Sequence, residues 1–130
     1  MRVLAVDDND TNLEVMKNLC GVLGFACDLA RDGAEAVEKA GAAGYDLVLM
    51  DICMPIMSGL DAALAIRALS GAAGTVPIIA VTANADRPEV CRYLDAGFRA
   101  VVAKPVNIIE LLGAIQEALD PELAVARPAA

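Results

Sequence analysis

Four short apolar runs in this chain each end in polar or charged residues, and this pattern most constrains how the chain can fold. The runs end at Asp7 and Asp8, at Asp51, at Thr82 and at Lys104. If the runs are parallel strands of one buried sheet, these end residues meet at one edge of it. Three carboxylates, a hydroxyl and an ammonium would then share a small space. That combination suits a divalent cation and a phosphoryl group.

Strand-like and helical patterns alternate five times along the sequence. Apolar runs predict strands at residues 2–6, 25–29, 46–50, 78–81 and 101–103, and the intervening patterns predict helices at 10–23, 33–42, 60–69, 86–96 and 108–119. Strict alternation predicts a parallel sheet with helices on both faces. We therefore expect the fold class to be α/β, a single three-layer domain of five βα units. In such sheets the ligand site lies beyond the carboxyl ends of the strands.

Capping and loop residues refine these boundaries. Asp10 or Thr11 can cap the first helix. The Gly-Ala-Ala-Gly sequence at residues 71–74 predicts a flexible link before the fourth strand. Residues 121–130 are rich in Ala and Pro and predict a frayed tail or linker. The expected organisation is one domain over residues 1–120, followed by that tail.

Composition and charge exclude several classes of function. A chain of 130 residues that is 58% apolar can bury a real core and is not disordered. The net charge of −8 leaves no basic field for binding nucleic acid or an anionic membrane, although a bound cation can reverse the charge locally. No apolar run reaches the ~18 residues of a membrane span, and no leader precedes the first strand. We expect a soluble, cytoplasmic domain.

The four cysteines do not form a recognisable metal or disulfide motif. They are Cys20, Cys27, Cys53 and Cys91, and the sequence has no Cys-x-x-Cys pair and no histidine to complete a zinc site. We interpret them as reduced and mostly as small core residues of a cytosolic protein. A disulfide framework is the less favoured alternative.

Each strand-end residue has an ordinary interpretation beside the functional one. Asp7 and Asp8 can be a solvated acid pair, and Asp51 can simply cap its loop. Thr82 can be present simply because β-branched residues are favoured in strands, and Lys104 can be a solvated residue at a strand end. As functional groups, the acids would hold Mg²⁺, Asp51 would attack phosphorus, and Thr82 and Lys104 would contact phosphoryl oxygens. Their joint occurrence at separate strand ends favours function.

Together these motifs resemble the receiver domain of two-component response regulators, the CheY-like family. The motifs are Val6-Asp7-Asp8-Asn9, Leu49-Met50-Asp51-Ile52-Cys53-Met54-Pro55, Ile79-Ala80-Val81-Thr82-Ala83 and Ala103-Lys104-Pro105, and the resemblance covers residues 2–119. It implies a flavodoxin-like parallel sheet in the order 2-1-3-4-5. It also implies a phosphorelay signalling switch rather than an enzyme with a free small-molecule product. Such a domain would still catalyse its own phosphorylation and dephosphorylation.

The resemblance assigns roles at the expected site. Asp51 would be the phosphoacceptor, and a histidine kinase or a histidine phosphotransferase would supply the phosphoryl group from a phosphohistidine. Asp8, Asp51 and the backbone carbonyl of Cys53 would ligate Mg²⁺. Asp7 would act on the metal mainly through bound water.

The resemblance also implies a switch. Thr82 would move to meet the phosphoryl group, Lys104 would contact another of its oxygens, and a downstream partner would read the surface of the fourth helix, fifth strand and fifth helix. Cys53 and Asn84 would flank the water that removes the phosphoryl group. Val101 stands where the family often has Tyr or Phe, so we do not expect the family's aromatic rotation here.

Three alternatives stay open from the sequence. A hydrolase of the haloacid-dehalogenase type would need a second acid two residues after Asp51, where the chain has Cys53. A flavin-binding flavodoxin-like domain would need a Gly- and hydroxyl-rich loop after the first strand, where the chain has acids. A phosphorylation-independent pseudo-receiver usually lacks an acid or the lysine, and all are present here. The sequence also leaves open whether this is a stand-alone regulator or the receiver of a hybrid kinase.

Overall fold

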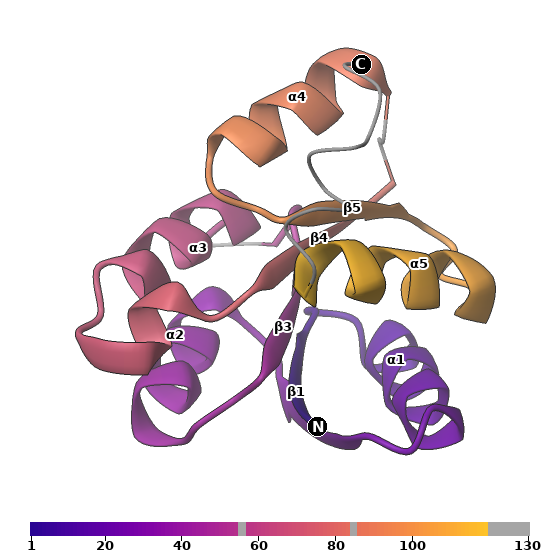
Figure 1. The fold of residues 1–130 in the computed structure, drawn as a ribbon, viewed down its shortest axis with the longest axis horizontal. Coiled ribbons are helices and arrows are strands. Elements are labelled where there is room, and N and C mark those ends of the chain that lie inside the picture. The colour runs from indigo at the N-terminus through magenta and orange to yellow at the C-terminus, as the bar shows by residue number, and fades with distance from the viewer. Residues whose placement is uncertain (55–56, 84–85, 120–130) are drawn as a thin grey trace.

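The computed structural model describes residues 1–54, 57–83 and 86–119 (Figure 1). The proline of the Met54-Pro55 turn, Asn84 and the 121–130 segment lie outside these residues. The predicted domain boundary at residue 120 therefore stays a prediction.

Five parallel strands form one sheet in the order β2-β1-β3-β4-β5, as predicted. The strands are β1 (Arg2–Val6), β2 (Ala26–Ala30), β3 (Leu47–Asp51), β4 (Ile78–Thr82) and β5 (Ala100–Ala103). The helices are α1 (Asp10–Val22), α2 (Gly33–Ala42), α3 (Gly59–Arg67), the 3₁₀ helix η1 (Gly71–Thr75), α4 (Arg87–Asp95) and α5 (Ile108–Leu119). The predicted elements are confirmed, with their ends shifted by up to two residues.

The sheet separates two apolar layers, because successive strand side chains point to opposite faces. Figure 1 shows α1 and α5 on one side of the sheet and α2 and α3 on the other. On the first side, Leu13 and Met16 of α1 and Leu111 of α5 pack against the sheet. On the second side, Ile66 of α3 and Tyr93 of α4 do so. All five residues of β3 are buried, as a central parallel strand covered on both faces requires.

Each of the five α-helices in the described residues is preceded by a residue whose side chain caps a backbone N–H group of the first turn. The capping residues are Asn9, Asp32, Ser58, Asp86 and Asn107, and each accepts a hydrogen bond from the N–H three residues ahead. The cap of α1 is therefore Asn9 and not Asp10 or Thr11, because its side-chain oxygen is the one that accepts from Asn12, at 3.2 Å.

Residues 71–74 are not a flexible link. They form the 3₁₀ helix η1, and its end is tied to α3 by Arg67, whose guanidinium donates to the carbonyl oxygens of Gly74 (3.4 Å) and Val76 (2.6 Å). A Cβ at Gly74 would lie 2.2 Å from the carbonyl oxygen of Leu69, so only glycine fits this close approach. The local composition predicted a loop, and contacts with α3 decided otherwise.

The cysteines are free, as predicted, but they are not mostly core residues. Cys20 is buried and Cys27 is half-buried, whereas Cys53 and Cys91 are exposed. Cys53 lies in the loop after β3 and Cys91 on the outer side of α4, where helical phase turns it to solvent.

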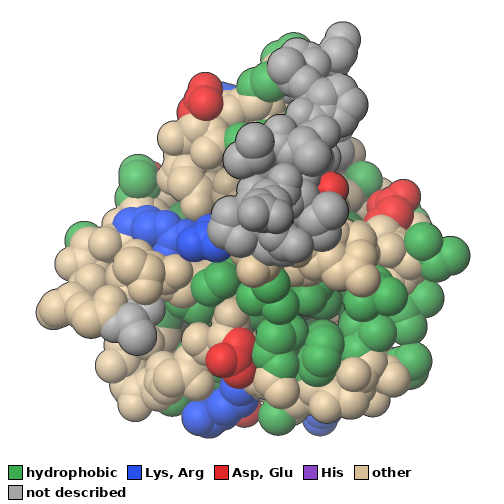
Figure 2. Space-filling model, in the orientation of Figure 1, with side chains coloured by type: hydrophobic (Ala, Val, Ile, Leu, Met, Phe, Trp, Pro, Cys, Tyr) green, Lys and Arg blue, Asp and Glu red, His purple; other side chains and the backbone are tan. Residues whose placement is uncertain are grey.

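Figure 2 shows hydrophobic side chains gathered on the surface over α1 and α5. The large exposed ones on these two helices are Val15, Val22, Ile109, Leu112 and Leu119. Among the described helices, none combines the length and apolar character needed to cross a membrane.

Candidate functional site

Three carboxylates meet at the carboxyl ends of β1 and β3. One carboxylate oxygen from each of Asp7, Asp8 and Asp51 lies within 4.8 Å of the other two. Asp7 is fully buried, Asp51 is 2% exposed, and Asp8 is exposed. The sequence predicted this meeting, because β1 and β3 are neighbours and both end at this edge.

Lys104, directly after β5, reaches across to two of these acids. Its Nζ donates to Oδ1 of Asp51 at 3.0 Å and forms an ion pair with Oδ2 of Asp7 at 3.1 Å. The first contact has hydrogen-bond geometry, and the second is a charge contact without it. One ammonium thus faces two buried carboxylates, so it does not balance their combined negative charge.

Two buried carboxylate oxygens at this site are left without a hydrogen-bond partner among the described residues. They are Oδ2 of Asp7 and Oδ2 of Asp51. The other oxygen of Asp7 accepts the backbone N–H of Asn9 at 2.9 Å, a contact that local sequence did not reveal. Buried carboxylate oxygens that accept no hydrogen bond are costly, even where one of them faces an ammonium, so such atoms call for a ligand. Clustered carboxylate oxygens are the ligand type that Mg²⁺ takes, so the residues present fit this ion.

The electrostatics of the site follow from burial and charge. Burial raises the pKa of Asp51, and the negative charge of Asp7 adds to this, while the hydrogen bond from Lys104 opposes it. Burial lowers the pKa of Lys104, but its contacts with Asp51 and Asp7 outweigh burial, so the pKa is raised overall. The negative charge of Asp51 is therefore under-compensated, and the ammonium of Lys104 is held in its charged form.

Thr82 ends β4, the strand beside β3, and is 3% exposed. Asp51 pairs in register with Val81, the residue before it, and the Lys104 N–H donates to the Thr82 carbonyl oxygen at 2.8 Å. Thr82 therefore lies at the same edge of the sheet as the acids and the lysine. Cys53 is exposed two residues after Asp51, and its carbonyl as a metal ligand stays a prediction.

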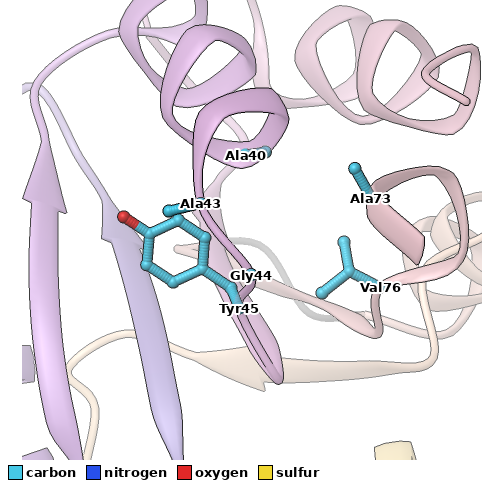
Figure 3. Close-up of a pocket in the computed structure, with 6 residues that line it drawn as sticks. All are labelled: Ala40, Ala43, Gly44, Tyr45, Ala73 and Val76. Atoms are coloured by element: carbon cyan, nitrogen blue, oxygen red, sulfur yellow. The ribbon is translucent and has the colours of Figure 1, made fainter. Parts of the chain in front are cut away.

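A small cavity lies away from the carboxylates and is a poor candidate for the site. It is a cavity of about 30 Å³ between α2 and η1, lined by Ala40, Ala43, Gly44, Tyr45, Ala73 and Val76 (Figure 3). Its volume suits about one water molecule, and its walls are apolar. Tyr45 and Val76 precede β3 and β4, so the cavity is at the amino end of the sheet. The Tyr45 hydroxyl donates instead to Oδ2 of Asp28, at 2.7 Å.

The sequence model for the response regulator receiver domain matches residues 3–116. The chain belongs to this family. The family match covers the motifs that end in Asp8, Asp51, Thr82 and Lys104.

Relatives and solved structures agree with the assignment. Hybrid signal transduction histidine kinase G of Dictyostelium discoideum is 39% identical over 113 residues, which cover 85% of this chain and 3% of that kinase. Sensor histidine kinase RcsC of Escherichia coli is 37% identical over 108 residues, 83% of this chain and 11% of that kinase. The chain therefore spans a small part of the curated relatives that it matches.

Two solved structures have the same fold. The receiver domain of sensor histidine kinase PA1611 from Pseudomonas aeruginosa PAO1, described with a magnesium ion coordinated in its active site cleft, gives a TM-score of 0.81 at 36% identity and covers 91% of this chain and 96% of that one. Chemotaxis protein CheY4 of Vibrio cholerae gives a TM-score of 0.81 at 28% identity, over 90% of this chain and 97% of that one.

The receiver interpretation is thus confirmed, and with it the CheY-like fold. The chain is a signalling domain of two-component systems, homologous to the receivers of hybrid histidine kinases, and not a classical enzyme. A phosphorylation-independent pseudo-receiver is not favoured, because the family's acids and lysine are present and share one site.

Proposed function

We propose that Asp51 accepts a phosphoryl group from a phosphohistidine on a histidine kinase or histidine phosphotransferase. The observation that carries the proposal is the pair of buried carboxylate oxygens on Asp7 and Asp51 that have no hydrogen-bond partner within the described part of the chain, beside the Lys104 ammonium. A purely structural ion pair would have its oxygens satisfied within the chain. Asp7, Asp8 and Asp51, with the Cys53 carbonyl, would hold Mg²⁺, which would offset the negative charge of the carboxylates and phosphoryl oxygens.

The transfer requires little covalent work from the chain. A carboxylate oxygen of Asp51 forms a bond to phosphorus while the phosphorus–nitrogen bond of the donor breaks, and the electron pair stays on the imidazole, which takes up a proton. Lys104 now donates to Asp51, and in the phosphorylated state it would donate to a phosphoryl oxygen instead. The Thr82 hydroxyl would donate to another one. Positioning and charge compensation therefore carry the step.

The proposal extends to the reverse step, the partners and the location. An in-line water would remove the phosphoryl group, and exposed Cys53 would flank its path. A downstream protein would bind the face formed by α4, β5 and α5. We place the domain in the cytoplasm, where the kinase has access to ATP.

The test is phosphorylation by acetyl phosphate with Mg²⁺, followed by intact-mass measurement. The unaltered protein should gain the mass of one phosphoryl group, and Asp51→Asn should gain none, because an amide oxygen is a poor nucleophile and forms no acyl phosphate. Asp28→Asn is the control and should behave like the unaltered protein, because Asp28 is paired with Arg2 and Tyr45 away from the site. Phosphorylation of Asp51→Asn, or none of the unaltered protein, would refute the proposal.

A further inference from the structure

The turn between β1 and α1 contains a residue, Asn9, that two hydrogen bonds anchor to the helix. Its side-chain oxygen accepts the N–H of Asn12 at 3.2 Å, and its carbonyl oxygen accepts the N–H of Leu13 at 3.1 Å. Its backbone is extended, with φ −102° and ψ 119°, as is usual for the residue that caps a helix. The first turn of α1 therefore fixes where Asn9 lies.

The N–H of Asn9 donates in the other direction, to the carboxylate site. It reaches Oδ1 of Asp7 at 2.9 Å, while the N–H of Asp7 donates to the carbonyl oxygen of Ala30 at 3.1 Å. The sheet thus fixes the backbone of Asp7, and the turn fixes one oxygen of its carboxylate. Because a carboxylate is rigid, holding one oxygen also restricts where the other one points.

The other oxygen, Oδ2 of Asp7, is the atom that is available to a ligand. It lies 3.1 Å from Nζ of Lys104 and accepts no hydrogen bond from the residues that the structure describes. Asp7 is fully buried, so water from the surface does not take the place of that partner. The bond from Asn9 therefore selects which oxygen of Asp7 is presented at the site.

Asp8 lies between Asp7 and Asn9, so the same turn also carries the exposed acid of the site. Oxygens of Asp7, Asp8 and Asp51 lie within 4.8 Å of one another, and negative charges at this spacing repel each other. The Lys104 ammonium offsets part of this repulsion through its contacts with Asp7 and Asp51. Without an ion, a turn that was not anchored would let the acids on it move away from Asp51.

We propose that Asn9 is a positioning residue that, by capping α1, holds Asp7 and Asp8 in place for Mg²⁺ before the ion binds. The inference rests on the proposed function, in which these acids hold the ion. The side-chain oxygen of Asn9 accepts from α1, so Asn9 acts through Asp7 and not as a ligand. Its contribution is preorganisation, because acids that are already in place lose less conformational freedom when the ion binds.

The test is the Mg²⁺ affinity of Asn9→Ala and Asn9→Ser, measured by isothermal titration calorimetry. Alanine removes the capping oxygen, whereas serine keeps one. We expect Asn9→Ala to bind Mg²⁺ about two- to fivefold more weakly, because the anchored turn is then populated only part of the time. Asn9→Ser should bind Mg²⁺ as the unaltered protein does.

The matched control is Asp32→Ala, which removes the cap of another helix. Asp32 follows β2 and caps α2 by accepting the N–H of Glu35 at 2.7 Å. Its loss should lower the unfolding temperature as Asn9→Ala does, but it should leave the Mg²⁺ affinity unchanged at physiological salt, where exposed charges are screened. Thermal unfolding of all three variants checks that they are folded.

Amide hydrogen exchange without Mg²⁺ measures the turn directly. If Asn9 only stabilised α1, Asn9→Ala would speed exchange at the amide of Asn12 and leave the amide of residue 9 protected. A positioning role predicts faster exchange at residue 9 as well, because its N–H is then released from Asp7.

Three results would overturn the role of Asn9 and leave the receiver function intact. They are an unchanged Mg²⁺ affinity in Asn9→Ala, the same loss of affinity in Asp32→Ala or Asn9→Ser, and an amide of residue 9 that stays protected in Asn9→Ala. Failure of the unaltered protein to bind Mg²⁺ would instead refute the proposed function itself.

Discussion

Two polar clusters of this domain contain similar side chains but differ in whether their hydrogen bonds are satisfied within the chain. The Arg2 cluster consists of Arg2, Asp28 and Tyr45. Its members satisfy one another: Asp28 accepts from the Tyr45 hydroxyl at 2.7 Å and from Arg2 at 3.1 Å, and the Arg2 guanidinium lies 5.2 Å from the centre of the Tyr45 ring. The carboxylate site of Asp7, Asp51 and Lys104 is more deeply buried, yet two of its oxygens accept no hydrogen bond from the residues that the structure describes.

The pKa values of the two acids, Asp28 and Asp51, are shifted in opposite directions. The hydrogen bond from Tyr45 lowers the pKa of Asp28, with Arg2 adding to the effect, whereas burial raises the pKa of Asp51. A carboxylate that stabilises the fold is provided with donors, and one that serves a ligand is buried without enough of them. This difference in pKa indicates that the carboxylate site, and not the Arg2 cluster, is the one suited to bind a ligand.

The largest effect on stability should come from removing the lysine of the carboxylate site. Lys104→Met leaves Asp7 and Asp51 buried without a counter-charge, which we expect to cost about 3 kcal/mol of unfolding free energy at neutral pH without Mg²⁺. The matched change Arg2→Met breaks an exposed pair and should cost less than about 1 kcal/mol. Urea denaturation measures both, and equal losses would mean that the two clusters do not differ in kind.

Adding Mg²⁺ should stabilise the folded protein through the carboxylate site and not through the Arg2 cluster. An ion that binds the folded state alone raises the free energy of unfolding, by about 2.7 kcal/mol at a hundred times its dissociation constant. Asp7→Asn should remove most of this gain, since it removes one of the three carboxylate charges that would hold the ion. Asp28→Asn should keep all of it. The measurement is urea denaturation at increasing Mg²⁺ concentrations, and a gain that survives Asp7→Asn would place the ion elsewhere.

The carboxylate site should also be sensitive to the backbone beside it. A Cβ at Gly59 would lie 2.1 Å from the carbonyl oxygen of Asp51, so Gly59→Ala should cost about 2 kcal/mol by forcing the two segments apart. Gly21→Ala is the control, because nothing lies within 4 Å of its Cβ, and it should stabilise α1 by about 0.5 to 1 kcal/mol. Thermal unfolding tests the pair, and similar shifts in both variants would contradict the close approach.

The smallest expected effect is the pH dependence of the Arg2 cluster. Because the pKa of Asp28 is lowered in the folded state, its contribution is present above the ordinary pKa of about 4 and is lost as pH falls through the lower folded value. Tyr45→Phe should cost less than about 1 kcal/mol at pH 7, and the loss should shrink toward pH 2. If Tyr45→Phe cost the same unfolding free energy at pH 7 and pH 2, the ionisation of Asp28 would not explain the effect. On the alkaline side, burial and the same hydrogen bond raise the pKa of Tyr45 to about 12.

Much of the site was predictable because strand ends are local features. An apolar run followed by an acid or a lysine can be read from adjacent residues, and parallel pairing brings such ends to one edge. Asp7, Asp51, Thr82 and Lys104 were found in this way. The bond from the Asn9 N–H to Asp7 was not, because it depends on the turn that the chain takes after β1.

The amino-acid sequence by itself determined the alternation of strands and helices, the membership of the family and the set of groups gathered at the sheet edge. Only the tertiary structure decided that Asp7 is buried while its neighbour Asp8 is exposed, that residues 71–75 form a helical turn, and that the Tyr93 ring is buried against Phe98. The physical reason is the distance along the sequence over which each feature is encoded. Periodicity and chain order are encoded between near neighbours, whereas burial and hydrogen-bond partners depend on which distant segments pack together.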